Sequence, residues 1–158
     1  MPNLAELVKR LIDHKVQFVL VGGFAATIHG SACVTQDVDI CIPFTEANCR
    51  RLLSALQGLH PLHRENKRPI ATNPSRLAGL KNLYLLTDDG PLDVLGMVSE
   101  LGMYTELLSH TVEISLFDRV CRVLDIDGLI RSKRTLARPK DKEAILQLRA
   151  IKERLKRP

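Results

Sequence analysis

The sequence predicts an α+β fold, in which a mixed β-sheet is flanked by helices and the C-terminal end is helical. Apolar residues recur at helical spacing at both ends of the chain, β-branched runs occupy its middle, and glycine or proline separates many of the segments. The chain has 158 residues, of which 45% are hydrophobic, so it can bury the core of one domain. We expect a single domain over 1–158, with its core at about 15–125 and C-terminal helices at about 126–156.

The N-terminal part of the chain alternates between helical and strand-like patterns. Apolar residues at helical spacing over 3–14 predict an amphipathic helix. A buried strand at 18–21 should follow and end at a glycine turn, and the segment FAATIHG favours a short helix that ends at Gly30. The β-rich segment VTQDVDICI predicts the next strand, and Thr45 can cap a helix that ends near Gly58.

The middle of the chain is less regular. The polar stretch 62–79 contains two prolines and is either a long loop or an irregular pair of strands. The strand-like runs NLYLLT and PLDVLGMV are joined by Asp-Asp-Gly, which predicts a hairpin. We expect a short helix near 99–108, and then strands at 111–116 and 119–124.

Two basic helices are predicted at the C-terminal end. Asp125 can cap the first, which runs to about Thr135, and the second runs from Pro139 to Leu155. Residues 131–158 hold 11 Lys and Arg against 3 Asp and Glu, a net charge of +8, whereas the rest of the chain carries −3. This asymmetry indicates either contact with an anionic partner, such as nucleic acid or nucleotide phosphates, or a solvated helix face.

Composition favours a cytoplasmic globular protein. The most apolar window, 16–28, is too short to cross a bilayer, and the N-terminus has the pattern of an amphipathic helix rather than of a signal peptide. The four cysteines form no CxxC pair and match no zinc spacing, so we expect free thiols in a reducing cytosol. Aromatic residues make up 4% of the chain, which argues against a stacking platform for single-stranded nucleic acid.

Asp37 and Asp39 stand out because they lie one residue apart in a segment with the composition of a buried strand. Alternate residues of a strand project to the same face, so these two carboxylates would point together and repel each other. A cation normally offsets such repulsion, and carboxylate oxygens suit Mg²⁺ or Mn²⁺. The other interpretation of this pair is a solvated strand end.

Two further features favour a phosphate-handling site beside this pair. Gly22 and Gly23 occupy a strand-to-helix turn, where backbone N–H groups can cradle a phosphate. Thirteen residues separate Gly23 from Asp37, which is enough for a short helix and a return turn. Asp93 is another lone acid among β-formers. If its strand neighbours the first, three aspartates converge on a site that can clamp the oxygens of a phosphoryl or nucleotidyl transfer.

Taken together, these motifs resemble the nucleotidyltransferase superfamily that includes DNA polymerase β. The strings VGGFAATIHGS…T-x-D-x-D and DGLIRSKRTLARPKDKEAI resemble its small prokaryotic members, including the AbiEii-type toxins and related minimal nucleotidyltransferases. The resemblance covers roughly residues 15–150 and implies the nucleotidyltransferase fold. Gly30-Ser31 also resembles the Gly-Ser pair of this superfamily, but five residues before Asp37 are too few for the intervening helix.

The resemblance implies a role for each matched residue. Gly22 and Gly23 would position a nucleoside triphosphate, and Asp37 and Asp39 would bind two Mg²⁺ (or Mn²⁺) ions that bridge its phosphates. Asp93 would hold the catalytic metal and favour deprotonation of an acceptor hydroxyl. That hydroxyl would attack the α-phosphate in line, with pyrophosphate as the leaving group.

Several nearby positions have two interpretations. Thr35 would either hydrogen-bond a phosphate or hold the aspartate-bearing strand in place. Lys133, Arg138 and Lys140 match the C-terminal string and would neutralise a triphosphate or grip an RNA acceptor, unless they only complement a helix dipole. Many relatives carry arginine two residues before the threonine, where this chain has Cys33, and the loss of that guanidinium implies weaker nucleotide binding.

The implied activity is Mg-dependent transfer of an NMP from an NTP such as ATP to a hydroxyl acceptor, which could be a tRNA, a protein or a small molecule. A toxin–antitoxin role with an antitoxin partner, and a homodimer, are compatible with the resemblance. The alternative is a catalytically weak or inactive member of the fold that serves as a binding or regulatory module. Four basic residues of the polar stretch would either contact the acceptor or be merely solvated: Arg64, Lys67, Arg68 and Arg76.

Overall fold

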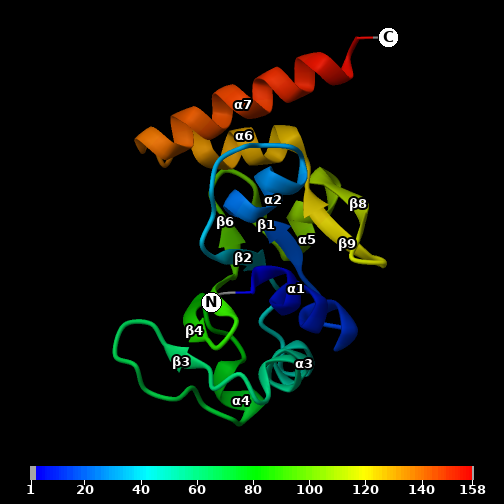
Figure 1. The fold of residues 1–158 in the computed structure, drawn as a ribbon. Helices are drawn as coiled ribbons and strands as arrows, with labels where there is room; N and C mark the ends of the chain where they lie inside the picture. The colour runs from blue at the N-terminus through cyan, green and yellow to red at the C-terminus, as the bar shows by residue number, and fades with distance from the viewer. Residues whose placement is uncertain (1–2, 158) are drawn as a thin grey trace.

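The computed structural model describes residues 3–157, which form a seven-stranded mixed sheet, a small two-stranded sheet, and helices on both faces of the larger sheet (Figure 1). The strands are β1 Val19–Val21, β2 Val38–Cys41, β3 Leu62–His63, β4 Asn82–Thr87, β5 Gly90–Leu95, β6 Met97–Val98, β7 Gly102–Met103, β8 Thr111–Leu116 and β9 Arg119–Leu124. The helices are α1 Leu4–Asp13, α2 Gly22–Ile28, α3 Glu46–Leu56, α4 Pro74–Leu77, α5 Tyr104–Leu107, α6 Ile126–Arg134 and α7 Pro139–Leu155, with a 3₁₀ turn at Leu108–His110.

The large sheet has the strand order β3-β4-β5-β2-β1-β9-β8. β1 runs antiparallel to β2 and parallel to β9, whereas β2 runs parallel to β5. The hairpins β4–β5 and β8–β9 extend the sheet on its two sides. The predicted mixed sheet is therefore confirmed, and its central strands come from segments far apart in the sequence.

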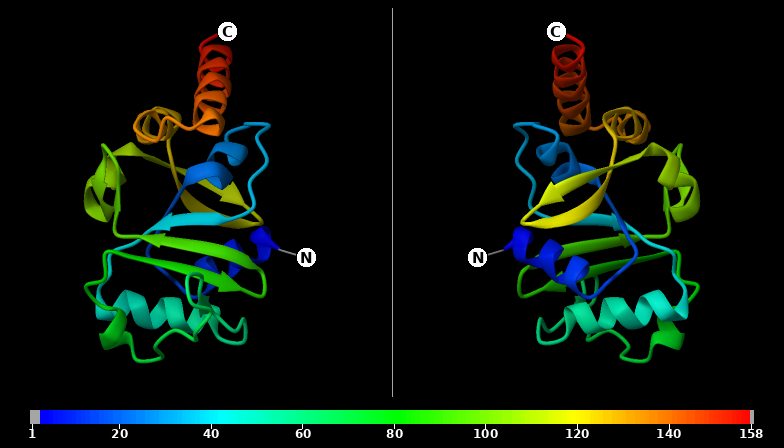
Figure 2. Two further views of the ribbon diagram at one scale, coloured as in Figure 1. Left: turned by 90° about the vertical axis from the view of Figure 1, so that its left-hand side faces the viewer. Right: turned by 90° about the vertical axis from the view of Figure 1, so that its right-hand side faces the viewer.

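Helices α1 and α3 cover one face of the sheet, and α2, α6 and α7 rise from the other face (Figure 2). The side chains of Leu7 and Leu11 in α1 and of Leu52 and Leu56 in α3 are fully buried, which accounts for the apolar stripes of both helices. The C-terminal helices pack on each other and on α2, so the basic end of the chain stands over the second face. Within residues 3–157, no helix combines the length and apolarity that a bilayer span requires.

Most predicted elements are confirmed, but the strand predicted at 34–42 is shorter than expected. β2 begins at Val38, and Val34 is 91% exposed. The reason is that β1 pairs with β2 only as far as Val21↔Asp39, after which the chain of β1 turns into α2. The residues before Val38 therefore lack a neighbouring strand on that side, and they form a loop.

Two other segments also differ from expectation. The stretch 62–79 contains the short strand β3 and a β-bridge between Leu62 and Pro69, as the irregular-strand interpretation predicted, but also the unpredicted helix α4. The run PLDVLGMV does not continue as one strand, because Gly96 donates its N–H to Lys81 O outside the ladder. Met97–Val98 and Gly102–Met103 instead form the second sheet, and the helix predicted at 99–108 begins at Tyr104.

Asn48 of α3 joins the outer ends of β1 and β2. Its side chain is fully buried, and its Oδ1 accepts the N–H of Gln17 at 2.7 Å. Its amide donates to Gln17 O at 3.0 Å and to Pro43 O at 3.1 Å. Because the segments just before β1 and just after β2 share one clamp, Asn48 fixes the pairing of the two strands that carry the glycine turn and the aspartates.

We expect Asn48→Ala to lower the free energy of unfolding by about 3 kcal/mol, because it leaves buried backbone groups of Gln17 and Pro43 without partners. Urea denaturation measures this loss. Asn66→Ala is the matched control, because the exposed Asn66 makes a single local hydrogen bond to Arg68 N, and it should cost less than about 1 kcal/mol. Equal losses in the two variants would contradict the clamp.

Candidate active site

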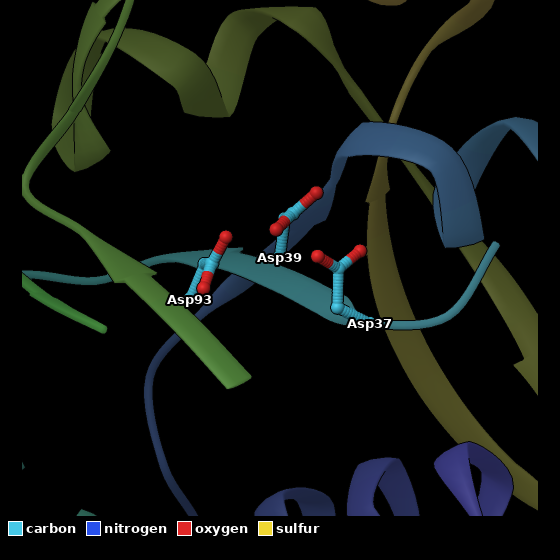
Figure 3. Close-up of side chains that lie close together, drawn as sticks. All are labelled: Asp37, Asp39 and Asp93. Atoms are coloured by element: carbon cyan, nitrogen blue, oxygen red, sulfur yellow. The ribbon is translucent and has the colours of Figure 1, made fainter. Parts of the chain in front are cut away.

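Three carboxylates meet on the face of the sheet that carries α2 (Figure 3). The parallel register of β2 and β5 places Asp39 directly opposite Asp93, and Asp37 immediately precedes β2. One oxygen from each of these aspartates lies within 4.8 Å of the others. The predicted convergence of the two acidic segments is therefore present in the structure.

The glycine turn approaches the same cluster from β1. Gly22 has a φ of +70°, and a Cβ built on it would lie 2.0 Å from Asp39 Oδ2. A Cβ on Gly23 would lie 3.0 Å from Thr35 Oγ1, which itself donates to Asp37 O at 3.1 Å. Glycine is thus required at Gly22 by both conformation and space, and Thr35 holds the backbone at Asp37 in place.

The cluster is electrostatically strained. Burial first, and then the charges of Asp37 and Asp93 and a hydrogen bond shared with Asp93, together raise the pKa of Asp39 to about 7, while the charge of Lys133 opposes the shift. A carboxylate pair that shares a proton is the expected response to like charges at this distance.

The aspartates line one wall of a cavity of about 560 Å³ between the sheet and the C-terminal helices. The cavity is bordered by every residue predicted to bind metal or nucleotide, though not by the four basic residues of the polar stretch: Gly22, Gly23, Thr35, Asp37, Asp39, Asp93, Lys133, and also Cys33, Arg138 and Lys140. The structure thus brings the predicted metal and nucleotide residues together, and their roles remain predictions.

The cationic wall of this cavity comes from α6 and the start of α7. Lys133 is 8% exposed, and burial lowers its pKa, while the charges of Asp141 and Asp39 oppose that shift. Arg138 Nε donates to Asp141 Oδ2 at 2.6 Å, and Asp141 is 2% exposed. Asp141 was not among the predicted site residues. It anchors Arg138 beside the cavity. The sequence signal that could have identified Asp141 is its position three residues after Arg138 at the start of a helix, which is the spacing of a capping box.

A second cation reaches the cluster from the opposite side. Arg64 Nη2 lies 2.5 Å from Asp93 Oδ1 in an ion pair. This approach lacks hydrogen-bond geometry, so within residues 3–157 Asp93 Oδ1 is a buried oxygen without a donor. The sequence identified Arg64 as one of four basic residues in a polar stretch, and nothing in the stretch distinguished it from the other three.

The donor set fits a divalent cation such as Mg²⁺ or Mn²⁺. It offers three carboxylates with oxygens in mutual reach, and hard oxygen ligands are what these ions prefer. A cation would also relieve the repulsion that, after burial, raises the pKa of Asp39.

Comparison with known proteins identifies the fold. No known family profile and no curated protein sequence matches the chain. Among solved structures, TM1012 from Thermotoga maritima, a protein provisionally assigned as a nucleotidyltransferase, aligns over 95% of this chain and 91% of its own, with a TM-score of 0.54 and 13% identity. At this identity the likeness is one of fold.

Two structures of the antibiotic-resistance factor ANT(2″)-Ia agree with this result. Its solution structure gives a TM-score of 0.57 at 14% identity, covering 95% of this chain and 80% of that one. Its crystal structure in complex with adenylyl-2″-tobramycin gives 0.55 at 13% identity, covering 95% of each chain. The chain therefore has the nucleotidyltransferase fold that its motifs predicted.

We expect Gly22→Ala to abolish binding of Mn²⁺, because the new Cβ would displace the Asp39 carboxylate as well as strain the backbone. Electron paramagnetic resonance titration of Mn²⁺ measures this loss. Gly58→Ala separates the two effects, since Gly58 also has a positive φ of +85° but nothing lies within 4 Å of its built Cβ. That control should cost about 1–2 kcal/mol of stability and leave Mn²⁺ binding intact.

The raised pKa of Asp39 predicts a pH-dependent stability in EDTA. The folded protein holds this proton more tightly than the unfolded chain, so the stabilisation is complete below about pH 4 and is lost as the pH rises towards 7. Asp39→Asn removes the effect. At pH 8 it should be more stable than the unsubstituted protein by on the order of 2–4 kcal/mol, with little difference near pH 4.

Urea titrations across this pH range test the prediction. Glu46→Gln, which neutralises an exposed acid on α3, should stay within about 0.5 kcal/mol of the unsubstituted protein throughout. Parallel pH profiles for Asp39→Asn and the unsubstituted protein would contradict the assignment.

Proposed function

We propose that the protein is a metal-dependent nucleotidyltransferase, which moves an NMP from an NTP to a hydroxyl acceptor. The observation that carries this proposal is the convergence of Asp37, Asp39 and Asp93 beside the Gly22 turn, in a cavity of a chain with the nucleotidyltransferase fold. Asp37, Asp39 and Asp93 would hold the metal. When bound, Mg²⁺ or Mn²⁺ would neutralise the charge that develops on the phosphate oxygens and lower the pKa of the acceptor hydroxyl.

The chain's own residues would bind and orient the nucleotide. Gly22 and Gly23 border the cavity at the start of α2, where their backbone N–H groups would bind a phosphate. Lys133 and Arg138 would bind the triphosphate from the opposite wall, where both border the cavity. Their charges would favour departure of pyrophosphate.

Arg138 also bears on the substitution of Cys33 for the arginine seen in many relatives. Both residues border the cavity, and the charge of Arg138 acts on Asp39 and Asp37 as well as on Asp141. We therefore propose that Arg138 supplies the guanidinium that position 33 lacks, so that Cys33 alone does not imply a loss of activity.

The narrower expectations remain predictions. These are the AbiEii-type relationship, a toxin–antitoxin role, an antitoxin partner, a homodimer, and ATP as the nucleotide. A cytoplasmic location accords with this proposal, because NTPs are cytoplasmic substrates and all four cysteines are free thiols.

Label transfer tests the activity. The protein is incubated with each α-³²P-labelled NTP, Mg²⁺ and either total RNA or cell extract, and the acceptors are separated by electrophoresis. We expect label on one acceptor class and a loss of at least about a hundredfold in Asp93→Asn, because the substitution removes a carboxylate from the metal site. Glu46→Gln, the same acid-to-amide change on the opposite face of the sheet, should retain activity.

A thermal shift separates an enzyme from a binding module. Mg²⁺ with the correct NTP should raise the Tm of the protein and leave the Tm of an Asp37→Asn/Asp39→Asn variant unchanged. Stabilisation without label transfer to any acceptor would favour the binding or regulatory module. The absence of both would refute the proposal.

A further inference from the structure

The acidic cluster continues as a row of polar side chains across the sheet towards its β3 edge. Asp39 of β2 pairs with Asp93 of β5, which pairs with Tyr84 of β4. Arg64, directly after β3, donates its N–H to Tyr84 O at 2.9 Å and so occupies the next place in the row. Side chains at paired positions of neighbouring strands project to the same face, so all four lie on the face that carries the candidate site.

Tyr84 and Arg64 are accessible. Tyr84 is 45% exposed, although its neighbours in β4, Leu83 and Leu85, are buried on the opposite face. The Arg64 side chain is 34% exposed and reaches past Tyr84 to Asp93. An exposed ring beside a guanidinium therefore flanks the acid cluster on the side away from α6 and α7.

The geometry of in-line attack indicates a role in acceptor binding for this row of side chains. The cations of α6 and α7 stand on the opposite side of the cluster, where they would attract the triphosphate. An in-line displacement requires the attacking oxygen to approach opposite the leaving pyrophosphate. The acceptor must then enter over Asp93, across the surface formed by Tyr84 and Arg64.

The chemistry of the two residues limits what this acceptor can be. A tyrosine ring stacks on a base or packs against a sugar, and a guanidinium pairs with phosphate in a bidentate geometry. An amine-rich acceptor would be repelled by Arg64. The end of a polynucleotide chain presents all the matching groups: a base, a phosphodiester and a free hydroxyl. One tyrosine is no platform for a long single strand, but it suffices for one terminal nucleotide.

We propose that Tyr84 and Arg64 form the acceptor subsite, which holds the terminal nucleotide of a single-stranded polynucleotide, with its base on Tyr84 and its backbone phosphate on Arg64. This inference rests on the proposed function. The terminal hydroxyl oxygen forms a bond to the α-phosphorus of the NTP, and the bond from that phosphorus to the bridging oxygen breaks. Pyrophosphate leaves with the electron pair, and the hydroxyl proton passes to solvent.

The ion pair of Arg64 with Asp93 couples the two halves of the site. Asp93 Oδ1 is shared between Arg64 and any cation held by the cluster, whereas an acceptor phosphate offers the guanidinium another partner. Removal of Arg64 should therefore weaken acceptor binding and leave Mn²⁺ binding equal or tighter. Loss of a residue that only stabilised the fold would not weaken acceptor binding while leaving Mn²⁺ binding undiminished.

Fluorescence anisotropy of 5′-labelled single-stranded RNA and DNA oligonucleotides, with Mg²⁺ present, tests the subsite. We expect Arg64→Gln and Tyr84→Ala each to weaken binding by about tenfold, and Tyr84→Phe to retain it because the ring remains. Arg76→Gln is the matched control: Arg76 is exposed on α4, which packs against α3 and so belongs with the helices on the opposite face of the sheet, and its loss should change binding by less than about twofold (Figure 1). A preference between the oligonucleotides then identifies the sugar that is accepted.

Equal weakening in the Arg64 and Arg76 variants would show non-specific attraction and overturn the subsite. The subsite would also be overturned if neither oligonucleotide bound the protein. If Mg²⁺ and NTP still raised the Tm in that case, the proposed function would stand. Loss of Mn²⁺ binding in a folded Arg64→Gln variant, measured by electron paramagnetic resonance, would also overturn it. Absence of the NTP-dependent rise in Tm counts instead against the proposed function.

Discussion

The mutual repulsion of three carboxylates is the constraint on which the rest of the structure depends. Asp37, Asp39 and Asp93 lie close together although burial and like charge oppose this arrangement. What holds them is the opposite face of the same strands, where Ile40 and Val94 pair with each other and are fully buried in the core. The hydrophobic core below the sheet thus supplies the free energy that keeps the acids together above it.

The basic side chains around this cluster lie on two sides of it and come from different parts of the fold. Lys133 in α6 and Arg138 at the start of α7 come from the C-terminal end, whereas Arg64 directly follows the short strand β3 at the other margin of the sheet. Part of the positive charge at the C-terminal end is therefore directed at the acidic cluster rather than spread on a solvated helix face. A nucleotide bound between the helices and an acceptor bound over β4 would meet at Asp93.

The fold and the predicted site could largely be derived from the sequence because their signals are local. Periodicity, caps and the Asp-Asp-Gly turn locate α1, α3, α6, α7 and the hairpins, and the lone acids among β-formers identify the cluster. The shortened β2 and the separate β6 were missed because strand length depends on neighbours that are distant in the sequence. Arg64 and Tyr84 could not be selected for the same reason: only the register across three strands places them beside Asp93.

The close approach of Gly22 to Asp39 also limits how this site can evolve. Every codon change that replaces glycine introduces a side chain with a β-carbon, and at this position any such carbon collides with the Asp39 carboxylate. No neutral intermediate exists between a working site and a lost one. In a lineage that abandoned catalysis but kept the fold, the positive φ would still favour glycine at this position, whereas the acids could change to amides that still fit.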